Sequence, residues 1–181
     1  MIGLDDNSLM LSVKAGKTDR LSLLYERHKG PLYGFFYRMT SDREISEDLV
    51  QNVFLRILKY KHTYSGEGKF TTWYYHLARN VMADYFKKNN RYQPMGDQDW
   101  SNRLGHDEHA EAELTAVQDK ELLQKAMKKL PHEKYELLMM VKFQKLRYEQ
   151  VADIVGCSVG ALKVRVHRTI PELRDIYLSM Q

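Results

Sequence analysis

The sequence predicts an all-α protein: two small helical domains joined by a flexible linker, the second containing a helix-turn-helix. Apolar residues recur every three or four positions along nearly the whole chain, and this period is typical of amphipathic helices. No run alternates polar and apolar residues in the way that indicates a strand. The helical period stops between about residues 93 and 117, where Pro, Gly, Asp and Glu accumulate. This segment is therefore predicted to connect the two domains, with a helix resuming from about Glu108 as the alternative to a connector without helix.

Composition narrows the class of protein. A chain of 181 residues suits one or two modest domains, and its formal net charge is +4. Its single cysteine, Cys157, excludes an intramolecular disulfide and fits a reducing compartment. The N-terminal residues lack the pattern of a signal peptide, and no uncharged apolar stretch approaches the roughly 18 residues of a membrane span. We expect a cytoplasmic protein without membrane insertion.

The charge of the chain follows the predicted domain boundaries. We place the first domain at 1–92, the linker at 93–117 and the second domain at 118–181; the domains are basic and the linker is acidic. An acidic connector between basic domains could mimic nucleic acid, or keep the domains from binding it early. The alternative is that the acidic residues simply keep the connector soluble.

The first domain is expected to contain three successive helices. Apolar residues predict a helix over 21–39, in which Pro31 predicts a kink or a break into two short helices. Ser41 or Asp42 is expected to cap the second helix. A loop with two glycines, residues 61–69, then leads into the third helix.

This third helix combines consecutive aromatic residues with a basic end, in "TTWYYHLARNVMADYFKKNNR" at 71–91. On a helix, its apolar residues cover more than half of the circumference, which is wide for a surface helix. One interpretation is a core helix with a solvated basic edge. The other is a helix that offers stacking faces and cations to unpaired bases. The remaining strip carries His76, Arg79, Asn80, Ala83 and Lys87, followed by Lys88 and Arg91.

Residues 148–168, "YEQVADIVGCSVGALKVRVHR", are typical of a helix-turn-helix. Gly156 can adopt a positive φ at the turn, and Ser158 can cap the second helix. That second helix buries Leu162 and Val166, and a face with cations and no acid suits the major groove and its phosphates. The alternative is an ordinary helical hairpin whose exposed cations are solvated. The outward positions are Ala161, Lys163, Val164, Arg165, His167 and Arg168.

Together these segments resemble a bacterial sigma factor of the extracytoplasmic-function (ECF) type, in the sigma-70 family. The resemblance covers roughly 20–91 and 120–175, with three blocks in the order and spacing of the family. The first block contains Glu47, Asp48, Gln51 and Phe54, and the second contains Trp73, Ala78, Arg79, Asn80 and Asp84. The third, "LPHEKYELLMMVKFQKLRYEQVADIVGCSVGALKVRVHR", resembles the C-terminal DNA-binding domain of the family.

The resemblance implies binding to core RNA polymerase and promoter DNA, and an inhibitory anti-sigma factor. In this family the first domain melts and holds the −10 element, and the second reads the −35 element. The loop from His62 to Lys69 aligns with the loop that captures a flipped base. The implied −10 contacts are His62, Lys69, Trp73, His76, Arg79, Asn80, Lys87 and Arg91. The implied −35 contacts are Ser158, Ala161, Lys163, Arg165, His167 and Arg168.

The second helix of the first domain carries a separate candidate surface. Its core stripe is predicted to contain Ile45, Leu49, Val53 and Ile57, whereas Leu55 falls on the opposite side. A lone exposed leucine is ordinary. The resemblance implies instead that this side binds polymerase through Asp48, Gln51, Asn52 and Leu55.

Two departures from the family pattern occur in the last helix. Ala161 and Val164 stand where the family often has hydroxyl side chains, so apolar contacts with thymine methyl groups become possible. Pro171 lies where the family helix usually continues, and its ring predicts a kink near Thr169-Ile170.

Two other classes of protein compete with this prediction. For an enzyme, His106 and His109 could ligate a metal and Glu47-Asp48 is a carboxylate pair, but the histidines lack a matching second cluster. Adjacent carboxylates on a helix point apart. We therefore expect no catalytic residue, metal or cofactor. The second rival is a stand-alone helix-turn-helix regulator with an N-terminal sensing or interaction domain, which would bind duplex DNA without polymerase.

Overall fold

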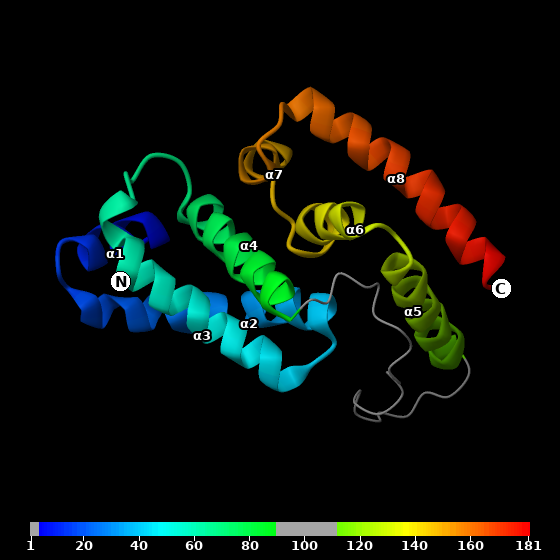
Figure 1. Ribbon diagram of the computed structural model, residues 1–181, viewed down its shortest axis with the longest axis horizontal. Helices are drawn as coiled ribbons and strands as arrows, with labels where there is room; N and C mark the ends of the chain where they lie inside the picture. The colour runs from blue at the N-terminus through cyan, green and yellow to red at the C-terminus, as the bar shows by residue number, and fades with distance from the viewer. Residues whose placement is uncertain (1–3, 90–111) are drawn as a thin grey trace. The chain divides into compact units, whose positions relative to one another are not determined.

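The computed structural model describes residues 4–89 and 112–181, with side chains from 118 onward in the second range (Figure 1). Its described residues form helices and no strand, so the all-α prediction is confirmed. The chain divides into two compact units. The first contains Met1–Tyr92 and Glu149–Gly156, and the second contains Gln93–Tyr148 and Cys157–Gln181.

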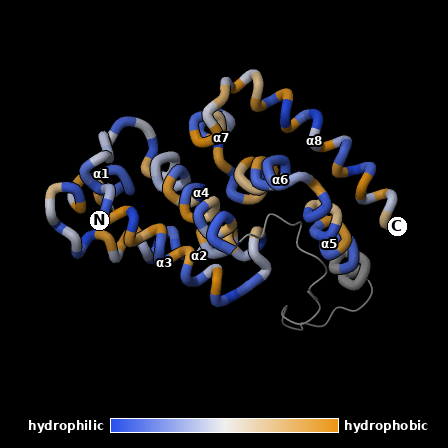
Figure 2. The backbone as a smooth tube through the Cα atoms, viewed as in Figure 1, coloured by the Kyte–Doolittle hydropathy of each residue, from blue (hydrophilic) through white to orange (hydrophobic). Residues whose placement is uncertain are grey.

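Four helices form most of the first unit: α1 (Asp6–Lys14), α2 (Leu21–Thr40), α3 (Arg43–Tyr60) and α4 (Phe70–Lys88). A short 3-10 turn, Thr18–Arg20, precedes α2. Helix α3 contacts α2 and α4, and α1 contacts α2 and α4. Apolar and polar residues follow one another at helical spacing along each helix (Figure 2). The apolar ones form a core that includes Leu24, Phe35, Phe36, Leu49, Val53, Ile57, Tyr75 and Ala78.

Helix α2 continues through Pro31 as one helix, so a break into two short helices is wrong. A proline in a helix interior loses one backbone hydrogen bond and costs about 3 kcal/mol. Leu24 before it and Leu32 and Phe35 after it are fully buried. Each such burial contributes about 1.5–3 kcal/mol. Packing on both sides of Pro31 therefore outweighs the lost bond.

Asp42 is the residue that caps α3. Its Oδ1 accepts a hydrogen bond from the backbone N–H of Ile45 at 3.0 Å. Ser41 instead adopts a left-handed conformation (φ 56°) at the end of α2. The two residues thus separate α2 from α3, one as terminator and the other as cap.

The remaining helices are α5 (Ala112–Lys128), α6 (His132–Leu138), α7 (Tyr148–Val155) and α8 (Val159–Ser179). Leu130 and Pro131 lie between α5 and α6, where a proline suits the start of a helix better than its interior. Helix α5 begins inside the range proposed for the linker, and residues 90–111 lie outside the described part. A π-helical turn, Met139–Phe143, follows α6 and has no counterpart in the sequence prediction.

Helix α8 also continues through a proline, Pro171. Proline has no N–H to donate to the carbonyl of His167. Two residues earlier, the hydroxyl of Thr169 donates to the carbonyl of Arg165 at 2.8 Å. Thr169 is buried with Leu162 and Val166, so the buried face of α8 lies in the turns before the proline.

Candidate nucleic-acid interface

The broad apolar side of α4 is core. Buried residues on it are Phe70, Tyr74, Tyr75, Ala78, Val81, Met82 and Phe86. Trp73 is only half-buried, and its ring lies 5.1 Å from that of Tyr64 and 6.2 Å from that of Phe70, centroid to centroid. For most of the aromatic residues the core interpretation is therefore confirmed. Trp73 alone among the three consecutive aromatics keeps a substantial exposed surface.

The remaining strip of α4 combines half-buried and exposed residues. His76 and Arg79 are half-buried, whereas Asn80, Ala83 and Lys87 are exposed. The one acid in the strip, Asp84, is paired with Arg56 of α3 at 2.6 Å. Its charge is thus balanced locally. Arg91 lies outside the described residues.

Helix α7 belongs to the first unit and contacts this strip. Arg79 Nη1 donates to the carbonyl of Ile154 at 2.8 Å, and His76 Nε2 lies 3.7 Å from Asp153 Oδ1. Gln150 Nε2 donates to the hydroxyl of Thr71 at 2.9 Å. The strip can therefore form polar contacts along its length, which a purely solvated edge would not require.

The loop before α4 has an ordered conformation set by specific residues. It begins with a 3-10 turn, Lys61–Thr63, on which His62 is exposed, and ends at Lys69, also exposed. Gly66 and Gly68 have φ values of +82° and +73°, a region that disfavours residues with a side chain. Tyr64 points inward and is fully buried.

Burial changes the ionisation of the tyrosines around this loop. It raises the pKa of Tyr64 to about 12, with a further contribution from the nearby carboxylates of Asp5 and Asp6. Burial likewise raises the pKa of Tyr75 to about 12 and that of Tyr74 well above its usual value. All three phenols are therefore neutral near pH 7.

Helix α1 was missed by the sequence prediction, although it contacts this loop directly. Asn7 Nδ2 donates to the carbonyl of Gly68 at 2.6 Å, and Lys14 Nζ donates to the carbonyl of Tyr64 at 2.6 Å. A local signal for the helix was present. Asp5 caps it by accepting from the N–H of Ser8 at 2.9 Å, and an acid before an amphipathic run is typical of a helix start.

The predicted polymerase surface on α3 is exposed as expected from its spacing. Asp48, Gln51 and Asn52 all face solvent. Leu55 is 66% exposed, the largest value among the large hydrophobic side chains that the structure describes. Leu49, Val53 and Ile57 of the predicted core stripe are buried, so the two sides of α3 are correctly distinguished by the sequence.

The helix-turn-helix prediction is confirmed in its local geometry. Gly156 has φ +72°, and Ser158 caps α8 by accepting from the N–H of Ala161 at 3.1 Å. Leu162 and Val166 are buried. The other predicted contact residues are exposed: Ala161, Lys163, Arg165, His167 and Arg168.

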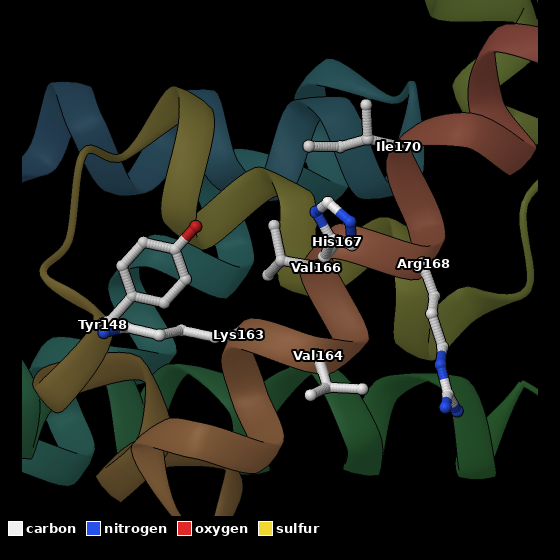
Figure 3. A pocket seen from close by; sticks show the side chains of 7 residues that line it. All are labelled: Tyr148, Lys163, Val164, Val166, His167, Arg168 and Ile170. Atoms are coloured by element: carbon white, nitrogen blue, oxygen red, sulfur yellow. The ribbon is translucent and has the colours of Figure 1, made fainter.

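A pocket lies along one side of α8 (Figure 3). Its lining combines basic side chains with apolar ones, which suits contacts to both phosphates and base methyl groups. Arg165 does not line it. The lining residues are Tyr148, Lys163, Val164, Val166, His167, Arg168 and Ile170.

Other site types find little support in the described residues. In residues 4–89 and 112–181, no three His, Cys, Asp or Glu side chains are grouped to hold a metal. His106 and His109 lie outside these ranges. None of the described helices has the length and apolar character needed to cross a membrane.

Known families match both units. The family described as Sigma-70 region 2 matches residues 24–92, and the one described as Sigma-70, region 4 matches residues 120–170. Two relatives are each 25% identical to this chain. The RNA polymerase sigma factor YlaC of Bacillus subtilis aligns over 158 residues, 86% of this chain and 91% of that protein. The ECF RNA polymerase sigma-E factor of Haemophilus influenzae aligns over 173 residues, 91% of each.

Solved structures share the fold. CnrH, solved in complex with the cytosolic domain of CnrY, has a TM-score of 0.74 at 16% identity, covering 97% of this chain and 99% of the other. The sigma factor RpoE of Bartonella quintana, solved with the anti-sigma factor NepR, has a TM-score of 0.66 at 19% identity, covering 86% and 95%. From the two region matches and the curated relatives, the chain belongs to the sigma-70 family as an ECF sigma factor, which directs core RNA polymerase to promoters.

Proposed function

We propose a division of labour between the two domains of this sigma factor. The first domain, residues 1–92, binds core polymerase and opens the −10 element. The second, residues 118–181, reads the −35 element, and residues 93–117 connect them. The observation that carries this proposal is the structure of α4. Its aromatic side is buried, so its polar strip faces outward beside the ordered loop that precedes the helix.

At the −10 element, α4 and the preceding loop hold the melted strand. Base stacking lost on melting must be replaced by an aromatic or apolar surface, and the phosphates need cations. Trp73 supplies the part of its side chain that is not buried, and Asn80 and Lys87 face the strand. Arg79 exchanges its bond to the Ile154 carbonyl for a phosphate. His62, Lys69, His76 and Arg91 complete the proposed set.

At the −35 element, α8 enters the major groove with its N-terminal turns, where recognition helices contact base edges. Arg165 lies one turn into the helix between the apolar residues Val164 and Val166, and we assign it to base reading. Lys163 and Arg168 are assigned to phosphates. Ser158, Ala161 and His167 complete the proposed −35 set.

The exposed side of α3 is the proposed polymerase surface. Leu55 supplies an apolar anchor, ringed by the polar side chains of Asp48, Gln51 and Asn52. Anchors of this kind dominate interface energies when a polar rim excludes water around them.

An anti-sigma factor is a further proposed partner. CnrH and RpoE, which share this fold, were each solved with a protein bound, and the partner of RpoE is named as an anti-sigma factor. We infer that this chain acts in the cytoplasm, where polymerase and promoter DNA are found. It is proposed to act by binding alone, without catalysis or a cofactor.

The −10 assignment can be tested by separating melting from strand binding. Arg79→Ala together with Asn80→Ala should reduce transcription from a duplex promoter more than duplex engagement, because both side chains act after the strands part. A promoter with a pre-melted −10 bubble should restore transcription. Lys145→Ala, an exposed cation of the second unit outside every proposed contact set, controls for loss of charge. An equal defect on both templates would show strand binding without a melting role.

A further inference from the structure

Helix α1 is an integral part of the first unit although the region 2 match begins only at residue 24. Three of its four apolar residues, Leu9, Met10 and Val13, are completely buried. Burial of three such side chains contributes several kcal/mol. Helix α1 therefore has a fixed position against the rest of the unit.

Asp6 anchors the start of α1 to α2. Its Oδ1 accepts from Arg27 Nη1 at 2.8 Å, and its Oδ2 lies 2.7 Å from His28 Nε2. Arg27 also donates to the carbonyl of Leu4 at 2.9 Å. His28 is buried, with its ring 5.4 Å from that of Phe70. The polar anchor thus reaches the start of α4.

The next residue, Asn7, bridges the end of the loop and the first turn of α4. Its Nδ2 donates to the Gly68 carbonyl, and its Oδ1 accepts from the N–H of Phe70 at 2.7 Å. The residue at the cap position of α4, Lys69, makes no side-chain cap. Asn7 therefore caps α4 from another helix, 63 positions earlier in the chain.

Two more contacts from α1 hold the middle of the loop. Lys14 Nζ donates to the Tyr64 carbonyl. A side chain at Gly66 would meet Leu11 Cδ2 at 3.1 Å, so α1 and the loop backbone approach closely there. Both ends and the centre of residues 64–70 are thus tied to one rigid element.

We propose that Asn7 and Lys14 are positioning residues for −10 recognition, which shape the loop before DNA arrives. This inference rests on the proposed function, in which the loop receives a flipped base. A loop held in its binding conformation avoids the ordering cost that a flexible one would meet on binding. Neither residue needs to touch DNA.

The test compares Asn7→Ala and Lys14→Met with Ser12→Ala in holoenzyme. Ser12 lies on the same helix, but its hydroxyl donates to the Ser8 carbonyl within α1 and not to the loop. The probe is a pre-melted promoter with 2-aminopurine at each unpaired −10 position in turn. We expect Asn7→Ala to reduce the fluorescence change at one captured position and to weaken strand binding about fivefold, as for the loss of one helix cap. Ser12→Ala should behave as wild type.

Amide exchange at Phe70 separates positioning from general destabilisation. Asn7→Ala should speed exchange of this amide, whereas Ser12→Ala should leave it protected. Lys14 is exposed, so Lys14→Met should fold normally and still reduce the position-specific signal. An unchanged Phe70 amide in Asn7→Ala, or a uniform signal loss at all positions, would overturn the proposal.

His62→Ala and Lys69→Ala distinguish failure of this inference from failure of the proposed function. If these loop variants alter the signal while Asn7→Ala and Lys14→Met do not, the loop receives the base without help from α1, and the inference is wrong. If none of the four alters it, the loop does not receive a base, and both proposals fail.

Discussion

Tyr64 buries a phenol that has no hydrogen-bond partner among the described residues. A buried polar group without a partner costs about 1–3 kcal/mol. Tyr64→Phe removes the hydroxyl and keeps the ring contacts with Phe70 and Trp73. We expect the free energy of unfolding at pH 7 to rise by about 1 kcal/mol in denaturant titrations.

The same substitution should change the alkaline pH dependence of stability. The pKa of Tyr64 is about 12 in the folded protein and about 10 when unfolded. The unfolded state therefore loses this proton first, so wild-type stability falls as pH rises from about 10 toward 12. Tyr64→Phe should lessen that fall. Tyr75→Phe is the matched control at pH 7, because its hydroxyl is hydrogen-bonded to that of Tyr74 and its loss should destabilise. A Tyr64→Phe protein less stable than wild type at pH 7 would reveal a partner for the hydroxyl.

Three of the cations of α8, Lys163, Arg165 and Arg168, should differ in how their removal changes promoter binding. Lys163→Ala and Arg168→Ala should weaken binding evenly across −35 variants and lower the salt slope by about one unit each, as phosphate contacts do. Arg165→Ala should cost about 1–3 kcal/mol and relax preference at one base pair. The measurement is holoenzyme binding to single-base −35 variants at several salt concentrations. If Arg165→Ala weakened binding equally for all −35 variants, Arg165 would be a phosphate contact and not a base-reading residue.

At the scale of elements, α3 keeps its core stripe and its proposed polymerase surface on separate sides. Leu55→Asp should therefore leave the helix folded and lower affinity for core polymerase by about 1–3 kcal/mol. Leu178→Asp is the matched control, since Leu178 is 56% exposed near the end of α8 and outside the proposed surface. Equal polymerase binding by both variants, with normal circular dichroism, would remove Leu55 from the interface.

Elements with a strong local signal were predictable from sequence. The sides of α3 follow from apolar spacing alone, and the turn before α8 follows from Gly156 and Ser158, because both depend on residues close in the chain. Helix α2 was less predictable, since packing of distant side chains decides whether Pro31 breaks it.

Long-range contacts account for what the sequence did not reveal. The bond of Asn7 to Phe70 joins residues 63 positions apart, and no local pattern marks it. The contact of Arg79 with the Ile154 carbonyl likewise depends on the folded chain. In the proposed −10 site the residue types were therefore predictable, but the residues that hold them in place were not.

At the scale of the whole molecule, two helices that we propose contact DNA lie on one chain: α4, beside the proposed polymerase surface, and α8, in a helix-turn-helix. A stand-alone regulator needs only the second. A sigma factor needs both, because selecting a promoter and opening it are separate steps. The region 2 match over 24–92 and the exposed Leu55 favour the sigma factor over the stand-alone regulator.

Transcription with purified core polymerase over a pool of bacterial promoter fragments tests most directly whether this protein acts as a sigma factor. The protein with core should start transcripts at a small set of sites that share −10 and −35 sequences, and the protein alone should select none of these fragments. Sequence-specific binding by the protein alone, with no polymerase-dependent starts, would contradict it and identify a stand-alone regulator.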